Sequence, residues 1–142
     1  FDAIQWFMGS QAPLAVTTAA GQVNLNGAEI PDTATVTLEF AENYLATFTL
    51  GYKTMRYSSF QDQMKHFHGS QARLDVNRDG WWLYPEQPAN VQLKAARERV
   101  ELGNFARATR DHLRNFLDCI RTRQDPNATV EHGLQTAIAL VM

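Results

Sequence analysis

The sequence predicts an α+β fold: a largely antiparallel, open β-sheet with helices on one face and the other face available for contact between subunits. Two observations support this prediction. The middle of the chain alternates polar and apolar residues with the period of a half-buried strand, and the last third has the apolar spacing of helices. The order of one helix, several strands and two helices is typical of α+β domains.

The first half of the chain predicts one short helix and three strands. A helix is expected over residues 2–9, where apolar side chains fall on one side and Gly9 is a suitable stop. An extended stretch over residues 13–23 follows. Residues 35–40 and 44–52 then alternate polar and apolar side chains across a short join, which predicts an antiparallel hairpin.

A further meander of strands is predicted at residues 64–68, 73–76 and 81–84. Between the last two, Asp79-Gly80 is expected to form the turn, with the glycine supplying a positive φ. No strand is predicted over residues 85–104, which have no clear pattern.

Two helices are predicted at the end of the chain. Residues 105–123 carry an apolar stripe, and Asp125-Pro126 ends that helix. Thr129 is a suitable N-cap for the second helix, and Glu131 lies in its first turn. The residues expected to be buried on the second helix are Leu134, Ala137, Ile138 and Val141.

Size and charge narrow the functional classes. The 142 residues fit one domain, and 44% of them are hydrophobic, which suffices for a core without disulfides. The net charge of -2 favours neither nucleic acid nor a membrane surface as partner. The single Cys119 cannot form an internal disulfide, and no run reaches the ~18–20 apolar residues of a membrane span.

No complete catalytic motif is present. The chain has no Gly-rich phosphate-binding pattern and no recognisable nucleophile–base motif. His66 and His68 are two apart on an expected strand and therefore share a face. Such a pair can bind zinc or another transition metal, but no third ligand is evident. We therefore expect a polar sheet face and no metal site.

Four polar residues are candidates for substrate binding. Lys53, Arg56 and Tyr57 cluster just after an expected strand, where a loop can present them to an anionic or hydroxylated ligand. His112 stands at the start of an apolar helical stripe, where a capping or packing role is the alternative. For Lys53, Arg56 and Tyr57 the alternative is that they belong to an ordinary exposed loop that binds no ligand.

Landmarks over nearly the whole chain resemble one known family. Residues 1–9, FDAIQWFMG, resemble the end of its stretch Gly-x-His-x-x-Asp-x-x-x-Trp-x-x-Gly, with Asp2, Trp6 and Gly9 matching. Ala72 stands where the family usually has a glycine. The other landmarks are residues 30–36, 67–77, 84–86 and 112–133. In their order and spacing they resemble the C-terminal domain of the glucose-fructose oxidoreductase, inositol dehydrogenase and MocA family.

The resemblance implies a two-domain enzyme. Residues 1–142 would be its substrate-binding and oligomerisation domain, with a fold like the C-terminal domains of dihydrodipicolinate reductase and glyceraldehyde-3-phosphate dehydrogenase. An N-terminal nucleotide-binding (Rossmann) domain, absent from this chain, would be its partner. The family's acid/base histidine would fall just before Phe1, so Asp2 would have a supporting catalytic role. A homodimer or larger homo-oligomer would form through the sheet.

The implied chemistry is hydride transfer between NAD or NADP and a sugar, inositol or similar polyol. The cofactor belongs to the full-length protein; we expect none to bind this chain, and we expect the chain alone to be inactive. Two alternatives stay open: an NAD-dependent glycoside hydrolase of the same architecture, and a non-enzymatic sheet module for assembly. The compartment also stays open, with the cytoplasm favoured over export.

Overall fold

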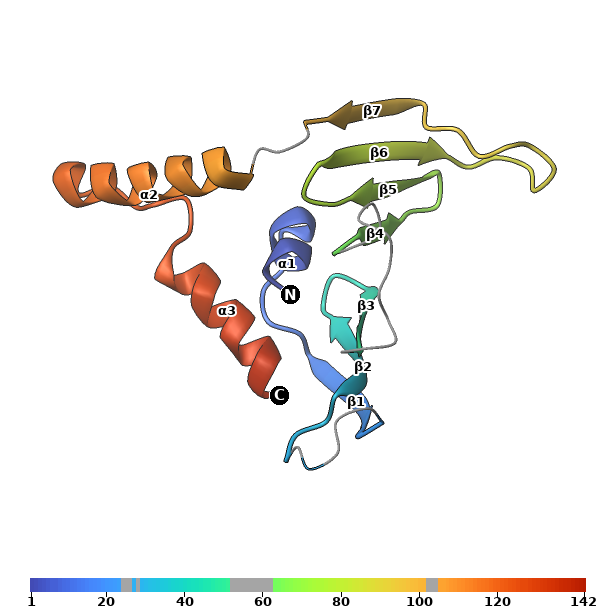
Figure 1. The fold of residues 1–142 in the computed structure, drawn as a ribbon, viewed down its shortest axis with the longest axis horizontal. Coiled ribbons are helices and arrows are strands. Elements are labelled where there is room, and N and C mark those ends of the chain that lie inside the picture. Colours follow the sequence, from blue (N-terminus) through green and yellow to red (C-terminus); the bar gives the residue numbers. More distant parts are fainter. Residues whose placement is uncertain (24–26, 28, 52–62, 102–104) are drawn as a thin grey trace. The chain divides into compact units, whose positions relative to one another are not determined.

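The α+β prediction is confirmed by the computed structural model, which describes residues 1–23, 27, 29–51, 63–101 and 105–142 (Figure 1). The described residues form three helices, a three-stranded sheet and a four-stranded sheet, and every pairing of neighbouring strands is antiparallel. The chain divides into two compact units, one of Phe1–Arg56 with Asp125–Met142 and one of Tyr57–Gln124. Each unit is described by itself.

The first unit contains two helices and the three-stranded sheet. Its elements are α1 (Asp2–Met8), β1 (Ala15–Gly21), β2 (Thr33–Phe40), β3 (Tyr44–Gly51) and α3 (Val130–Val141). β2 is the central strand, and its register places Val16, Leu38 and Ala46 side by side. That apolar face forms the core, in which Leu38 is fully buried and Ala139 of α3 packs against the sheet.

The other face of this sheet carries several threonines. Thr17, Thr37 and Thr47 pair across the three strands, and Thr35 pairs with Thr49. β-branched threonines fit a pleated strand while presenting hydroxyls to solvent. The sheet is therefore apolar on its packed face and polar on its other face.

The helix and hairpin predicted for the first unit are confirmed. Gly9 ends α1 with a left-handed φ of 63°, as expected of a helix C-cap. Asn43, in the join between β2 and β3, has a φ of 62°, a conformation that asparagine tolerates better than most residues.

The second unit contains the four-stranded sheet and one helix. Its elements are β4 (Lys65–His68), β5 (Ala72–Val76), β6 (Gly80–Pro85), β7 (Arg97–Val100) and α2 (Phe105–Thr122). The predicted meander and helix are confirmed, but the prediction of no strand over residues 85–104 is wrong. β7 pairs with β6 at the edge of the sheet, and its four residues are all exposed. An exposed, charge-rich edge strand has no apolar alternation to reveal it.

The explanation offered for Gly80 is also wrong. Its φ lies outside the left-handed region, so the turn between β5 and β6 does not use it for a positive φ. Asn77 shapes the turn instead, because its Oδ1 accepts hydrogen bonds from the backbone N–H groups of Asp79 and Gly80. A Cβ at Gly80 would collide with the carbonyl oxygen of Arg99 and lie 3.0 Å from the Cα of Val100. Glycine is therefore needed for the close approach of β7.

Burial on α3 differs from the prediction as well. Leu134 and Val141 are 56% and 83% exposed, whereas Ala139 is 4% exposed and Gln135 and Thr136 are half-buried. The buried face of α3 is therefore rotated around the helix axis relative to the apolar face that the sequence predicts. The reason is that the Thr136 hydroxyl donates a hydrogen bond to Gln5 of α1, and the Gln135 side chain accepts one from the N–H of Ala12, just after α1. The period of apolar residues does not reveal such bonds.

On α2 the predicted apolar stripe is present, but Leu113, Phe116, Leu117 and Ile120 are each about half exposed. None of the helices in the part of the chain that the structure describes is long and apolar enough to cross a membrane.

Candidate functional site

Asp2 stands at the first position of α1 with its carboxylate open to solvent. The helix starts where the Phe1 carbonyl oxygen accepts hydrogen bonds from the N–H groups of Ile4 at 2.9 Å and Gln5 at 3.3 Å. Asp2 Oδ1 accepts from the N–H of Ala3 at 2.8 Å, and the Asp2 side chain is 87% exposed. A carboxylate in the first turn is favourable beside the positive end of the helix dipole. The Asp2 carboxylate can accept further hydrogen bonds from a ligand or from a neighbouring side chain.

The other candidates cannot be assembled around Asp2 from this structure. Lys53, Arg56 and Tyr57 lie outside the described residues. His112 is an exposed residue of α2 in the second unit, whereas Asp2 belongs to the first. The proposed substrate-binding roles of these four residues stay predictions.

A polar cluster that sequence reasoning missed lies on the four-stranded sheet. Asp75 on β5 is only 4% exposed, and its Oδ1 lies 2.7 Å from Nδ1 of His66 on β4. Arg73 reaches both oxygens of the same carboxylate, with Nε 2.9 Å from Oδ1 and Nη2 3.1 Å from Oδ2. The guanidinium carbon of Arg73 also lies 4.9 Å from the centre of the Tyr84 ring. Each oxygen of the buried Asp75 carboxylate therefore has a hydrogen-bonding partner, His66 at Oδ1 and Arg73 Nη2 at Oδ2.

The two histidines have different neighbours on this polar face. The His66 ring uses Nδ1 for Asp75, and the rings of His66 and His68 stand 6.1 Å apart. Within the described ranges, no group of three or more histidine, cysteine, aspartate or glutamate side chains is placed to hold a metal ion. The signal that could have revealed this cluster is the period of two in the sequence, which places Arg73 and Asp75, like the two histidines, on one side of their strand.

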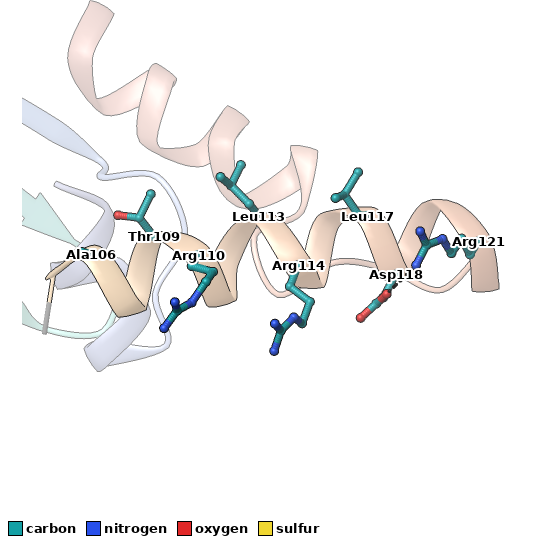
Figure 2. Close-up of a pocket in the computed structure, with 8 residues that line it drawn as sticks. All are labelled: Ala106, Thr109, Arg110, Leu113, Arg114, Leu117, Asp118 and Arg121. Atoms are coloured by element: carbon teal, nitrogen blue, oxygen red, sulfur yellow. Dashed lines mark hydrogen bonds and ion pairs between the residues drawn. The ribbon is translucent and has the colours of Figure 1, made fainter.

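A shallow groove runs along α2 (Figure 2). Its lining side chains project from this single helix, with Leu113 and Leu117 on one side and Arg110, Arg114 and Asp118 on the other. A surface formed by one helix cannot enclose a small ligand. We therefore give this groove no catalytic role.

Comparison with known proteins identifies the family. The profile described as the oxidoreductase family, C-terminal alpha/beta domain (GFO_IDH_MocA_C), matches residues 1–142. No protein with a curated description matches the chain significantly.

Solved structures share the fold at low sequence identity. One is a UDP-N-acetylglucosamine 3-dehydrogenase from Acidithiobacillus ferrooxidans, with 14% identity, a TM-score of 0.69 and coverage of 98% of this chain and 42% of that one. A protein of Thermotoga maritima assigned as an oxidoreductase has 17% identity, a TM-score of 0.67 and coverage of 98% and 39%. The WlbA dehydrogenase from Bordetella pertussis, solved with NADH and UDP-GlcNAcA, has 16% identity, a TM-score of 0.54 and coverage of 99% and 37%.

The chain thus spans about two fifths of the length of these solved proteins. Its sequence matches the family profile from end to end, and its strands and helices follow the same fold. The chain therefore belongs to the Gfo/Idh/MocA oxidoreductase family, of which it is the C-terminal α/β domain.

Proposed function

We propose that this chain is the substrate-binding domain of an enzyme that transfers a hydride between NAD or NADP and a sugar, inositol or similar polyol. The observation that carries the proposal is the family match over residues 1–142. Two proteins with the same fold are named as dehydrogenases; the name of one contains UDP-N-acetylglucosamine, and the other was solved with UDP-GlcNAcA. Both compounds are nucleotide-linked sugars. The NADH in one of those structures supports a nicotinamide cofactor for the full-length protein.

The cofactor would be held by a separate nucleotide-binding domain. The present sequence has no Gly-rich strand–turn–helix motif, which is what places backbone N–H groups against a pyrophosphate. α1 also presents a large apolar surface for a neighbour, since Trp6 is 77% exposed and Phe7 and Met8 are each 42% exposed. We assign this surface to contact with the nucleotide-binding domain.

Asp2 would support the chemistry from the first turn of α1. In an alcohol oxidation the carbinol carbon gives a hydride to the nicotinamide, while a base takes the hydroxyl proton. The exposed Asp2 carboxylate can accept a hydrogen bond from that base or from a substrate hydroxyl, and so orient it. This chain would supply the orientation and one wall of the substrate site, and the cofactor would supply the hydride acceptor.

A titration with NADH tests whether the cofactor binds to the separate nucleotide-binding domain. The chain of 142 residues should leave the nicotinamide fluorescence of NADH unchanged, whereas the full-length protein should alter it at micromolar concentrations. Stoichiometric binding by the chain alone would show that the cofactor site lies within it. With the full-length protein, reduction of NAD⁺ is then followed for glucose, myo-inositol and UDP-N-acetylglucosamine.

Replacement of Asp2 tests the proposed site. In the full-length enzyme Asp2→Ala should lower kcat/KM by ~10–1000-fold, that is ~1.4–4 kcal/mol, as expected for the loss of an orienting partner. The melting temperature should change little, because the Asp2 side chain is exposed and leaves no cavity. Glu42→Ala, at an exposed turn residue of the same unit, is the matched control. Equal kinetics for the Asp2 variant and the wild type would remove Asp2 from the site.

The two alternatives differ in their products. An NAD-dependent glycosidase would release free sugar from an aryl glycoside without net formation of NADH, and a dehydrogenase would form NADH from the free sugar. A non-enzymatic module would do neither, and the full-length protein would then lack NADH binding.

A further inference from the structure

α1 is held in place by a buried amide as well as by apolar packing. Gln5 is 7% exposed and is the buried residue of this helix. Phe1 and Ile4 pack against the core, while Trp6 is largely exposed to solvent. Gln5 adds a polar attachment to these apolar contacts.

Both polar ends of the Gln5 amide are engaged. Its Nε2 donates to the carbonyl oxygens of Gln11 at 3.1 Å and Gln135 at 3.2 Å. Its Oε1 accepts a hydrogen bond of 2.9 Å from the hydroxyl of Thr136. A reciprocal bond of 2.8 Å runs from the N–H of Ala12 to Oε1 of Gln135. These bonds join α1, the segment after it and α3.

The network specifies glutamine at position 5. Two of the partners are carbonyl oxygens, which can only accept, so they require the NH₂ group of an amide. A glutamate would place a carboxylate oxygen against them. A leucine would leave both carbonyl oxygens and the Thr136 hydroxyl without this partner in a partly buried setting, at a cost to α1's attachment.

We propose that Gln5 is a positioning residue, which fixes the pose of α1 and through it the place of the Asp2 carboxylate. This inference rests on the function proposed above. Asp2 lies three residues before Gln5, within about one turn of the same short helix, so a shift of α1 moves both residues. A misplacement of about 1 Å in a catalytic site can cost ~100-fold in rate. A small shift of α1 would therefore reach the chemistry while the fold stays intact.

The first test follows α1 by amide hydrogen exchange in the full-length protein. Gln5→Leu should speed exchange in the peptide that contains residues 3–9, and Thr136→Val should do so to a smaller extent. Gln11→Ala is the matched control, because Gln11 contributes its backbone oxygen to the network and its side chain is exposed. Exchange in α1 that is unchanged by Gln5→Leu would overturn the inference.

The second test is a double-mutant cycle that measures NAD⁺ reduction. Its substrate is the most active of glucose, myo-inositol and UDP-N-acetylglucosamine. Gln5→Leu should lower kcat by ~10–100-fold with little change in KM. In the Asp2→Ala background the same substitution should have almost no further effect, because both act through one carboxylate. Equal losses in both backgrounds would show that Gln5 does not act through Asp2. If Asp2→Ala itself leaves the kinetics unchanged, the proposed function of Asp2 fails, and the proposal for Gln5 fails with it.

Discussion

The buried Asp75 shows how a single residue depends on partners that the sequence does not reveal. The period of two predicted that His66 and His68 share a face, and it left their partner open. The register supplies it, because His66 on β4 and Trp82 on β6 both lie opposite Asp75. A buried carboxylate without hydrogen bonds would be strongly destabilising, and His66 and Arg73 remove that cost.

Gln5 illustrates the same limit. Polar residues are usually exposed, so the pattern of α1 gave no reason to expect a buried one. Its partners Gln135 and Thr136 follow about 130 residues later in the chain. Only the packing of α3 beside α1 makes its burial favourable.

Tyr44 gives the first unit a pH-dependent stability. Burial raises the pKa of its phenol; the hydrogen bond of 2.5 Å with Ser10 opposes this effect, and nearby Glu42 adds to it. An unfolded tyrosine ionises near pH 10. The folded state therefore holds this proton more tightly, so the contribution to stability is complete below about pH 10 and is lost as the pH rises through the folded pKa.

Tyr44→Phe should accordingly flatten the fall in unfolding free energy above about pH 10. Urea unfolding of the wild type and the variant at a series of alkaline pH values measures this. At neutral pH the variant should be somewhat less stable, because Ser10 loses its partner. An identical alkaline slope in the two proteins would contradict the assignment to Tyr44.

At the scale of elements, helix ends were predicted better than helix faces. Thr129 caps α3 as expected, since its side chain accepts a hydrogen bond of 3.3 Å from the N–H of His132. A cap is a local interaction between near neighbours, so a sequence reveals it. The buried face of α3 and the edge strand β7 depend on partners far along the chain, and both were predicted wrongly.

Thr129→Ala should destabilise the chain by ~0.5–2 kcal/mol, the usual cost of losing a threonine N-cap. The pKa of Glu131 is lowered by two hydrogen bonds to its carboxylate, one from the backbone N–H of Glu131 and one from the Thr129 hydroxyl. The substitution should therefore also raise the pKa of Glu131 toward its ordinary value, as measured by NMR titration. Thr129→Ser keeps the hydroxyl and should preserve both properties. A Glu131 pKa that does not respond to Thr129→Ala would count against the bond.

For the whole molecule, the α+β class and most strands followed from the sequence, because periodicity is a local property. How the strands divide into two sheets did not, because register is set by contacts between distant residues. Adjacent residues on a strand face opposite sides, and the two tryptophans of β6 differ in burial accordingly: Trp82 is 7% exposed and Trp81 is 36% exposed. Trp82 shares its face with Asp75, and Trp81 lies on the other.

The face of Trp81 is the apolar side of the four-stranded sheet. The register places Val76 and Trp81 side by side, and next to them Phe67, Leu74 and Leu83. Basic residues of the two edge strands flank this apolar centre: Lys65, Arg97 and Arg99. All five apolar residues are partly exposed within the chain. Contiguous apolar surface beyond a few hundred Å² is unusual on a monomer, and a two-fold dimer covers such a patch with its own copy. We therefore expect self-association through this sheet.

For this chain, light scattering after size exclusion at micromolar concentration should give the mass of a dimer or of a larger oligomer. Trp81→Glu should shift the mass to that of a monomer, because a charged side chain would replace the largest apolar side chain of this face. His68→Glu places the same charge on the opposite face of the same sheet and should leave the mass unchanged. A monomeric wild type would refute association through the sheet. An oligomer lost only with His68→Glu would move the interface to the Asp75 side, where His66 and Arg73 would become contact residues.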